Sequence, residues 1–198
     1  LRMLGLNTAK GGDGMMGLSA LPHTQDAARA AVDQAIAYGQ AIDAHNVHVM
    51  AGFASGPVAH ATFTDTLRYA CDQAEQMTVL IEPLNRFDAP GYFLQSTDQA
   101  AQIIAELNLP NLKLMFDCYH VGRTEGDLVA RLTTLMPIIG HIQFAGVPDR
   151  GTPLQGSVNY AEVFHHIADL GYSAPLGAEY HPNGATEDSL GWMAELRV

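Results

Sequence analysis

Four oxygen-bearing side chains each follow, or nearly end, a short apolar segment of the sequence. They are Glu82 in VLIEPLN, Asp117 in LKLMFDCYH, Gln143 in GHIQFAG and Glu179 in PLGAEYH. If these segments are successive parallel strands, the four side chains gather at the carboxyl ends of the sheet, where three carboxylates would repel one another unless a cation lay among them. An all-oxygen set suits Mg²⁺ or Mn²⁺ better than Zn²⁺. The spacing therefore predicts a divalent metal site with Glu82, Asp117, Gln143 and Glu179 as ligands, against the simpler interpretation that each residue only marks a strand end.

A metal at this place indicates a class of reaction. Bound to the carbonyl and the neighbouring hydroxyl of a hydroxy-carbonyl compound, it would polarise the carbonyl and stabilise the enediolate that forms when the adjacent carbon loses a proton. A carboxylate on each side of the substrate plane could then remove and return protons. Glu82 and Glu179 are the two glutamates of the set and lie farthest apart in strand order, so we assign them as the catalytic acid/base pair.

The elements that must position these residues alternate along the chain. Short runs rich in Val, Ile and Leu alternate with longer segments of helical periodicity, which is typical of βαβ units and a parallel sheet. Six strands are expected, at residues 1–7, 47–51, 78–84, 112–118, 139–145 and 175–180.

Helices are expected between the strands, because apolar residues recur there at helical spacing. One follows Thr24 and another follows Thr62. Ser96 with Gln99, and Asn159 with Glu162, have the spacing of capping boxes at two further helix starts. Residues 127–136 and 187–196 are predicted as additional helices.

The strands read as buried on both faces, which fits an open doubly wound sheet and a closed barrel alike. A barrel collects catalytic residues from the ends of several strands, whereas an open sheet concentrates them at one switch point. The four strand ends therefore favour an α/β fold of the TIM type, (β/α) units closing into a barrel, with residues 1–198 as a single domain.

Composition limits the partners. The chain has 198 residues, 47% of them hydrophobic, and a formal net charge of −11 with ten Lys and Arg in total. Clustered cations are needed to bind phosphates, so we expect neither nucleic acid nor an anionic membrane as a partner. No run reaches transmembrane length and no signal peptide is evident. Cys71 and Cys118 fall in a helical and a buried segment and favour free thiols, so a cytoplasmic protein is expected.

The residues quoted above carry a resemblance to a known family. The segments IEPLNRFDAPGYFLQSTDQA, NLKLMFDCYHVGRTEGDL, IGHIQFAGVPDRGTPLQGSVNY and GAEYHPNGATEDSLGWM resemble the hydroxypyruvate isomerases, which belong to the xylose-isomerase-like barrels. The match is dense over the last six tenths of the chain and looser before that, with NVHVMAG as the clearest early block. It implies a metal at the four positions, proton transfer by Glu82 and Glu179, and interconversion of hydroxypyruvate and 2-hydroxy-3-oxopropanoate (tartronate semialdehyde).

A complete barrel of this family has eight units, and the chain opens on what resembles the third strand. About six of the eight units are therefore expected here. Either the first two lie outside this sequence or a partner chain completes the barrel in a homo-oligomer. We favour the first interpretation, because open barrel edges are prone to aggregation.

Three further residues are predicted to bind substrate. His120 resembles a family position that contacts substrate oxygens. Arg86 offers a positive charge to a carboxylate. Asn7 ends the first strand and is expected to reach the same pocket.

Other functions stay open. NRFD after Glu82 is closer to the ketose 3-epimerases than to hydroxypyruvate isomerases, so an epimerase with the same metal site is the main alternative. An inactive, incomplete barrel is another. A phosphodiesterase related to endonuclease IV is disfavoured by the acidic balance, since a basic groove would be needed.

Overall fold

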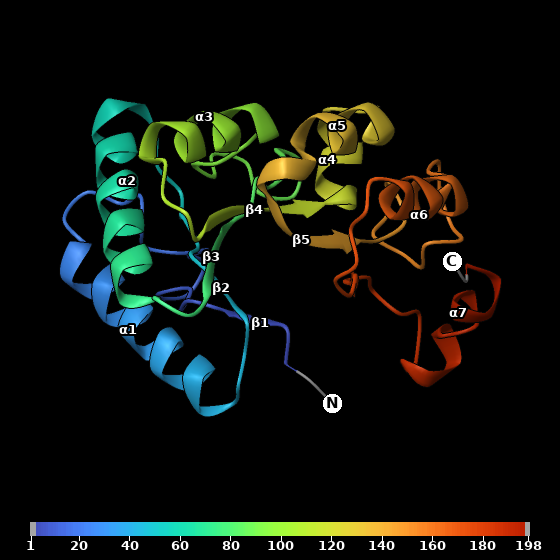
Figure 1. The fold of residues 1–198 in the computed structure, drawn as a ribbon, viewed down its shortest axis with the longest axis horizontal. Helices are drawn as coiled ribbons and strands as arrows, with labels where there is room; N and C mark the ends of the chain where they lie inside the picture. The colour runs from blue at the N-terminus through green and yellow to red at the C-terminus, as the bar shows by residue number, and fades with distance from the viewer. Residues whose placement is uncertain (1–2, 197–198) are drawn as a thin grey trace. The chain divides into compact units, whose positions relative to one another are not determined.

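The computed structural model describes residues 3–196, and the chain divides into two compact units, Leu1–Met115 and Phe116–Val198. The N-terminal unit contains three β/α repeats and the start of a fourth strand. In chain order these are β1 (Gly5–Asn7), α1 (Gln25–Ala41), β2 (Asn46–His48), α2 (Gly56–Gln73), β3 (Thr78–Ile81), α3 (Thr97–Leu107) and β4 (Leu112–Asp117), the last of which ends in the second unit (Figure 1).

The strands of the N-terminal unit pair in parallel and in sequence order. Leu6 lies opposite Val47, Val47 opposite Val79, and Val79 opposite Leu112. Val47, Val79 and Leu112 are all at most 1% exposed, as expected for strands covered on both faces. The parallel order brings the carboxyl ends of β1, β2 and β3 to one edge of the sheet, and that edge is where the predicted site residues of this unit lie.

The predicted helices form because one face of each is apolar. In α1, Ala28, Val32, Ala35, Ile36 and Gly39 are buried. Helix α2 buries Phe63, Leu67 and Ala70, but it begins at Gly56, well before Thr62, after which it was predicted to start. Pro57 explains the early start, since proline is favoured in the first turn, where its missing N–H leaves no hydrogen bond unmade.

The predicted cap of α3 is confirmed. Ser96 Oγ accepts a hydrogen bond from the Gln99 amide at 3.2 Å, and Gln99 Oε1 accepts one from the Gln95 amide at 3.1 Å. Ser55, at the corresponding position of α2, has no side-chain cap hydrogen bond. The two serines thus offer a matched pair for measuring the contribution of a cap.

We expect Ser96→Ala to lower the free energy of unfolding by about 1 kcal/mol, because the Gln99 amide loses its acceptor. Ser55→Ala should change it by only a few tenths of a kcal/mol, within the usual range of an exposed substitution. Urea titration followed by circular dichroism measures both, and equal effects would contradict the capping role of Ser96.

The C-terminal unit continues with shorter elements. They are α4 (Cys118–Thr124), α5 (Leu128–Leu135), the 3₁₀ turn η1 (Met136–Ile138), β5 (Ile139–Phe144), α6 (Tyr160–Asp169), β6 (Gly177–Ala178), the 3₁₀ turn η2 (Glu187–Ser189) and α7 (Trp192–Glu195). Strands β5 and β6 are parallel, with Gln143 opposite Gly177.

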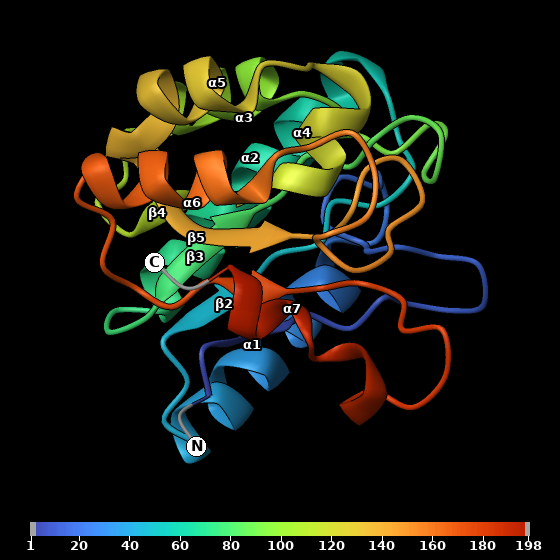
Figure 2. The same ribbon diagram turned by 90° about the vertical axis from the view of Figure 1, so that its right-hand side faces the viewer.

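An aromatic cluster attaches α6 and α7 to β5. Figure 2 shows the ribbon of α6 directly above β5. The Phe144 ring centroid lies 4.8 Å from that of Phe164, 5.7 Å from that of Tyr160 and 5.5 Å from that of Trp192. The α6 start was predicted correctly, since Asn159 Oδ1 accepts from the Glu162 amide.

One predicted helix of this unit was wrong, and one helix was missed. Residues 187–196 do not form one helix: the turn η2 and the four-residue α7 are separated at Leu190 and Gly191. Helix α4 was not predicted, because its seven residues are too few to show a helical period. The strand β4 accordingly ends at Asp117, and Cys118 is the first residue of a helix.

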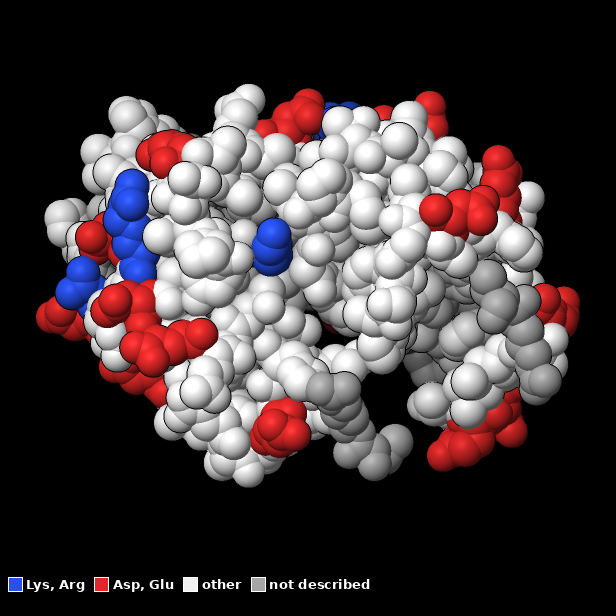
Figure 3. Space-filling view, in the orientation of Figure 1, with Lys and Arg blue, Asp and Glu red and all other residues white. Residues whose placement is uncertain are grey.

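The surface agrees with the acidic composition. The face drawn in Figure 3 carries scattered Asp and Glu side chains and few Lys or Arg. Within residues 3–196, no helix has both the length and the apolar character needed to cross a bilayer.

Candidate active site

Glu82 lies directly after β3 and is only 6% exposed. Its Oε2 is 3.7 Å from Nδ1 of His48, the last residue of β2. The same Nδ1 is 3.2 Å from Oδ1 of Asn7, the last residue of β1. Three neighbouring strands thus each end in one member of a polar row in the N-terminal unit.

His48 was missed by sequence reasoning. It is 4% exposed, and burial lowers the pKa of its imidazole to about 4, so the ring is neutral at physiological pH. Its Nε2 is buried and forms no hydrogen bond with any of the described residues. His48 is the last residue of β2, and the next strand, β3, leads to Glu82. This polar side chain at a strand end is the signal that could have identified His48.

Asp117 ends β4 in the C-terminal unit and is 1% exposed. Its Oδ1 accepts a hydrogen bond from the Tyr119 amide at 2.8 Å and caps α4. Its Oδ2 is 3.6 Å from His120 Nε2 and 3.8 Å from Arg150 Nη2, both beyond hydrogen-bond distance. Burial raises the pKa of Asp117 to about 7, although the Tyr119 amide and Arg150 favour the charged form.

Arg150 connects Asp117 to Glu179. Its Nη2 is 2.8 Å from Glu179 Oε2, its Nε donates to the Glu179 carbonyl at 3.2 Å, and its guanidinium lies 4.9 Å from the centroid of the Tyr119 ring. Glu179 follows β6, and its side chain is 53% exposed. Arg150 was also missed by sequence reasoning, because a loop residue seven positions after Gln143 has no periodic signal.

Gln143 lies on β5, one residue before the strand ends. Its Oε1 is buried and accepts no hydrogen bond among the described residues. A Cβ on the opposite residue, Gly177, would lie 3.1 Å from Gln143 Cγ and 3.0 Å from His141 Nε2. Glycine on β6 therefore leaves room for the amide side chain.

The donor set of the C-terminal unit fits a hard divalent cation. Asp117 Oδ2 and Gln143 Oε1 are both buried acceptor oxygens that receive no hydrogen bond from the described residues. Buried acceptors are normally satisfied, and an unsatisfied one calls for an explanation such as an ion. Carboxylate and amide oxygens are ligands that Mg²⁺ and Mn²⁺ accept.

The remaining predicted residues are placed as follows. His120, in α4, is 4% exposed and lies beside Asp117. Asn7 lies beside His48. Arg86 is exposed, with its guanidinium 5.1 Å from the centroid of the Phe87 ring. The N-terminal unit thus holds Asn7, His48, Glu82 and Arg86, and the C-terminal unit holds Asp117, His120, Gln143, Arg150 and Glu179.

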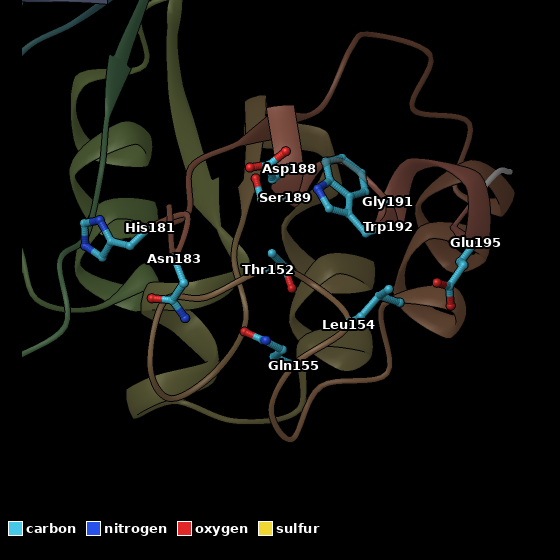
Figure 4. A pocket seen from close by; sticks show the side chains of 10 residues that line it. All are labelled: Thr152, Leu154, Gln155, His181, Asn183, Asp188, Ser189, Gly191, Trp192 and Glu195. Atoms are coloured by element: carbon cyan, nitrogen blue, oxygen red, sulfur yellow. The ribbon is translucent and has the colours of Figure 1, made fainter. Parts of the chain in front are cut away.

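A separate pocket of about 310 Å³ in the C-terminal unit lies among Thr152, Gln155, His181, Asn183, Ser189 and Trp192, with other residues (Figure 4). None of the four predicted metal ligands lines it. Its wall is partly held by hydrogen bonds from Trp192 Nε1 to Tyr180 Oη at 3.2 Å and between Tyr180 Oη and Ser189 Oγ at 2.6 Å.

Alternating strands and helices, with acidic and amide side chains at successive strand ends, define an enzyme of the TIM-barrel class. The comparisons with known proteins specify the family. Residues 1–196 match the family described as Xylose isomerase-like TIM barrel. The chain belongs to this family.

Its relatives are isomerases. The chain is 40% identical over 186 residues to the 2-oxo-tetronate isomerase of Cupriavidus necator, covering 91% of this chain and 72% of that protein. It is 37% identical over 191 residues to the hydroxypyruvate isomerase of Escherichia coli K12, covering 93% and 74%.

A solved structure has the same fold. The crystal structure of AP endonuclease, family 2 from Brucella melitensis superposes with a TM-score of 0.95 at 34% identity, over 100% of this chain and 80% of that one. The predicted barrel fold, the resemblance and the isomerase class are confirmed.

Proposed function

We propose that the chain interconverts the ketone and aldehyde forms of a small hydroxy-keto acid, with hydroxypyruvate and 2-hydroxy-3-oxopropanoate as the substrate pair. The observation that carries the proposal is the pair of buried acceptor oxygens, Asp117 Oδ2 and Gln143 Oε1, next to a carboxylate that an arginine holds in place. The names of the two isomerase relatives support keto acids of three and four carbons as the substrate class.

Glu82, Asp117, Gln143 and Glu179 would together hold the divalent cation, Mg²⁺ or Mn²⁺. When bound, it would act as a Lewis acid on the substrate carbonyl.

The two glutamates are assigned to proton transfer. Glu82 removes a proton from the carbon that bears the terminal hydroxyl, and its electron pair forms the enediolate double bond. Glu179 delivers a proton to the neighbouring carbon, and the proton of the terminal hydroxyl passes to the former ketone oxygen, so that the terminal carbon becomes the aldehyde and its neighbour an alcohol. Exchange with solvent then returns both glutamates to their starting protonation states. The burial of Glu82 supports its assignment as the base, because burial keeps competing water away from the carboxylate. Asn7 and His120 are assigned to hydrogen bonds with substrate oxygens.

We assign the substrate carboxylate to Arg150 in preference to Arg86. Arg150 is only 20% exposed and already lies 2.8 Å from Glu179 Oε2, whereas Arg86 is exposed and packs on Phe87. A planar guanidinium can bind a second carboxylate through its remaining donors.

We therefore expect Arg150→Met to raise KM for hydroxypyruvate about tenfold or more, since a charge-assisted hydrogen bond is removed. Arg86→Met, the same change at the exposed arginine, should leave KM within about twofold. Initial-rate kinetics distinguish the two. A large rise in KM for Arg86→Met alone would instead assign the substrate carboxylate to Arg86, the residue predicted from the sequence.

The proposed function is tested by incubating the full-length protein with hydroxypyruvate or 2-oxotetronate and Mg²⁺ or Mn²⁺, and following the aldehyde by ¹H NMR. Conversion of either acid supports the proposal. Epimerisation of a free six-carbon ketose, without conversion of the acids, would favour the ketose 3-epimerase alternative. Absence of all three reactions in the full-length protein would favour an inactive barrel.

A further inference from the structure

The imidazole of His48 has a fixed orientation but one uncommitted nitrogen. Its Nδ1 faces two acceptor oxygens, Asn7 Oδ1 at 3.2 Å and Glu82 Oε2 at 3.7 Å. Because both are acceptors, Nδ1 carries the hydrogen of the neutral ring, and Nε2 is left with a lone pair.

That lone pair lies in a buried place. His48 is 4% exposed, and Nε2 has no hydrogen-bond partner among the described residues. Buried side-chain nitrogens are normally satisfied, so an unmatched one at the end of a strand beside a predicted base points to a ligand that donates a hydrogen bond.

The reaction proposed above supplies such a donor. During isomerisation the terminal hydroxyl becomes a carbonyl, so its O–H proton must leave as the carbon next to Glu82 is deprotonated. An acceptor beside that hydroxyl favours both the binding of the alcohol and the loss of this proton.

We propose that His48 is a substrate-binding residue whose Nε2 accepts a hydrogen bond from the terminal hydroxyl of the substrate, with Asn7 fixing the ring. The inference rests on the proposed function for the substrate class. It adds that His48 Nε2 is the group with which the protein distinguishes a hydroxylated acid from its deoxy analogue. A site with a buried acceptor discriminates strongly against a ligand that lacks the matching hydrogen, because the acceptor then stays unpaired.

Two substitutions separate the roles of the two ring nitrogens. His48→Asn retains a polar group near the Nδ1 position and removes Nε2. His48→Gln can place an amide oxygen near the Nε2 position. His60→Asn is the matched control, because His60 is a partly exposed histidine of α2 whose Nε2 contacts Glu106 at 2.8 Å.

The probes are glycerate and lactate, which differ only in the terminal hydroxyl, in the presence of Mg²⁺. We expect the wild type and His60→Asn to bind glycerate about tenfold or more tightly than lactate, by calorimetry. The ratio should fall close to one in His48→Asn and recover in part in His48→Gln. An unchanged ratio in His48→Asn would overturn the inference.

A second measurement reports directly which nitrogen of the His48 imidazole carries the hydrogen and whether Nε2 contacts the ligand. In ¹⁵N-histidine-labelled protein, the His48 signals should report hydrogen on Nδ1, and glycerate, but not lactate, should shift the Nε2 signal. A shift produced by Mg²⁺ alone would make His48 a metal ligand and overturn the hydroxyl contact.

The two proposals fail separately. If the wild type converts hydroxypyruvate while His48→Asn keeps the preference for glycerate, only the His48 assignment is lost. If no keto acid is converted but the glycerate preference still depends on His48, the binding role stands and the proposed reaction is lost.

Discussion

Replacing Glu82 by Gln should reduce kcat for hydroxypyruvate by about 10² to 10⁴-fold, the range over which a positioned general base accelerates a reaction. The amide has the shape of the carboxylate and can occupy the same place, 3.7 Å from His48 Nδ1, but it cannot take a proton from carbon. Because Glu82 is only 6% exposed, replacing its charge by a neutral amide of the same shape should not destabilise the fold. Stopped assays by ¹H NMR measure the rate, and thermal unfolding checks the fold.

Glu106→Gln is the matched control for this prediction. Glu106 lies on α3 in the same unit, and its side chain is 49% exposed and contacts His60. Its substitution should leave kcat within about twofold. Turnover by Glu82→Gln at more than about a tenth of the wild-type rate would contradict the assignment of Glu82 as the base.

Replacing Asp117 by Asn should weaken Mn²⁺ binding by about a hundredfold or more. Loss of a residue that only orients a ligand already weakens metal binding about 10 to 100-fold, and here the ligand charge itself is removed. The asparagine Oδ1 can still accept from the Tyr119 amide and keep the start of α4. Calorimetric titration of the metal-free protein with Mn²⁺ measures the affinity.

Asp127→Asn controls for the helix cap. Asp127 Oδ1 accepts from the Ala130 amide at 3.1 Å and caps α5, and the residue is exposed. The variant should therefore bind Mn²⁺ as the wild type does. Equal affinities in all three proteins would remove Asp117 from the ligand set.

Much of this architecture could be predicted because it depends on local chemistry. The apolar faces of α1 and α2 follow from side-chain period, and the cap at Ser96 follows from a hydroxyl three residues before a glutamine. The strand ends at Glu82, Asp117 and Glu179 were marked by a polar side chain after an apolar run.

What could not be predicted depends on contacts between distant segments. Arg150 meets Glu179 only because the loop after β5 turns back, and its backbone adopts φ 54°, which nothing in GVPDRG specifies. The importance of His48 emerges only when parallel pairing places β2 beside β1 and β3. Helix α4 is too short to show a period, and α7 packs through Trp192 onto Phe144 of β5.

The two carboxylate oxygens of Asp117 make different interactions, and this difference limits which residues position 117 can tolerate. Oδ1 is committed to the first turn of α4 and Oδ2 is left without a hydrogen bond, so the plane of the carboxylate is set by the helix. Glutamate would carry its charge one methylene farther from the backbone and lose the cap, and histidine would supply a nitrogen ligand but no suitable acceptor for the Tyr119 amide. A library of all residues at position 117, selected for metal-dependent turnover, should therefore return aspartate almost alone, whereas libraries at exposed caps such as Asp127 should return Ser, Thr and Asn as well.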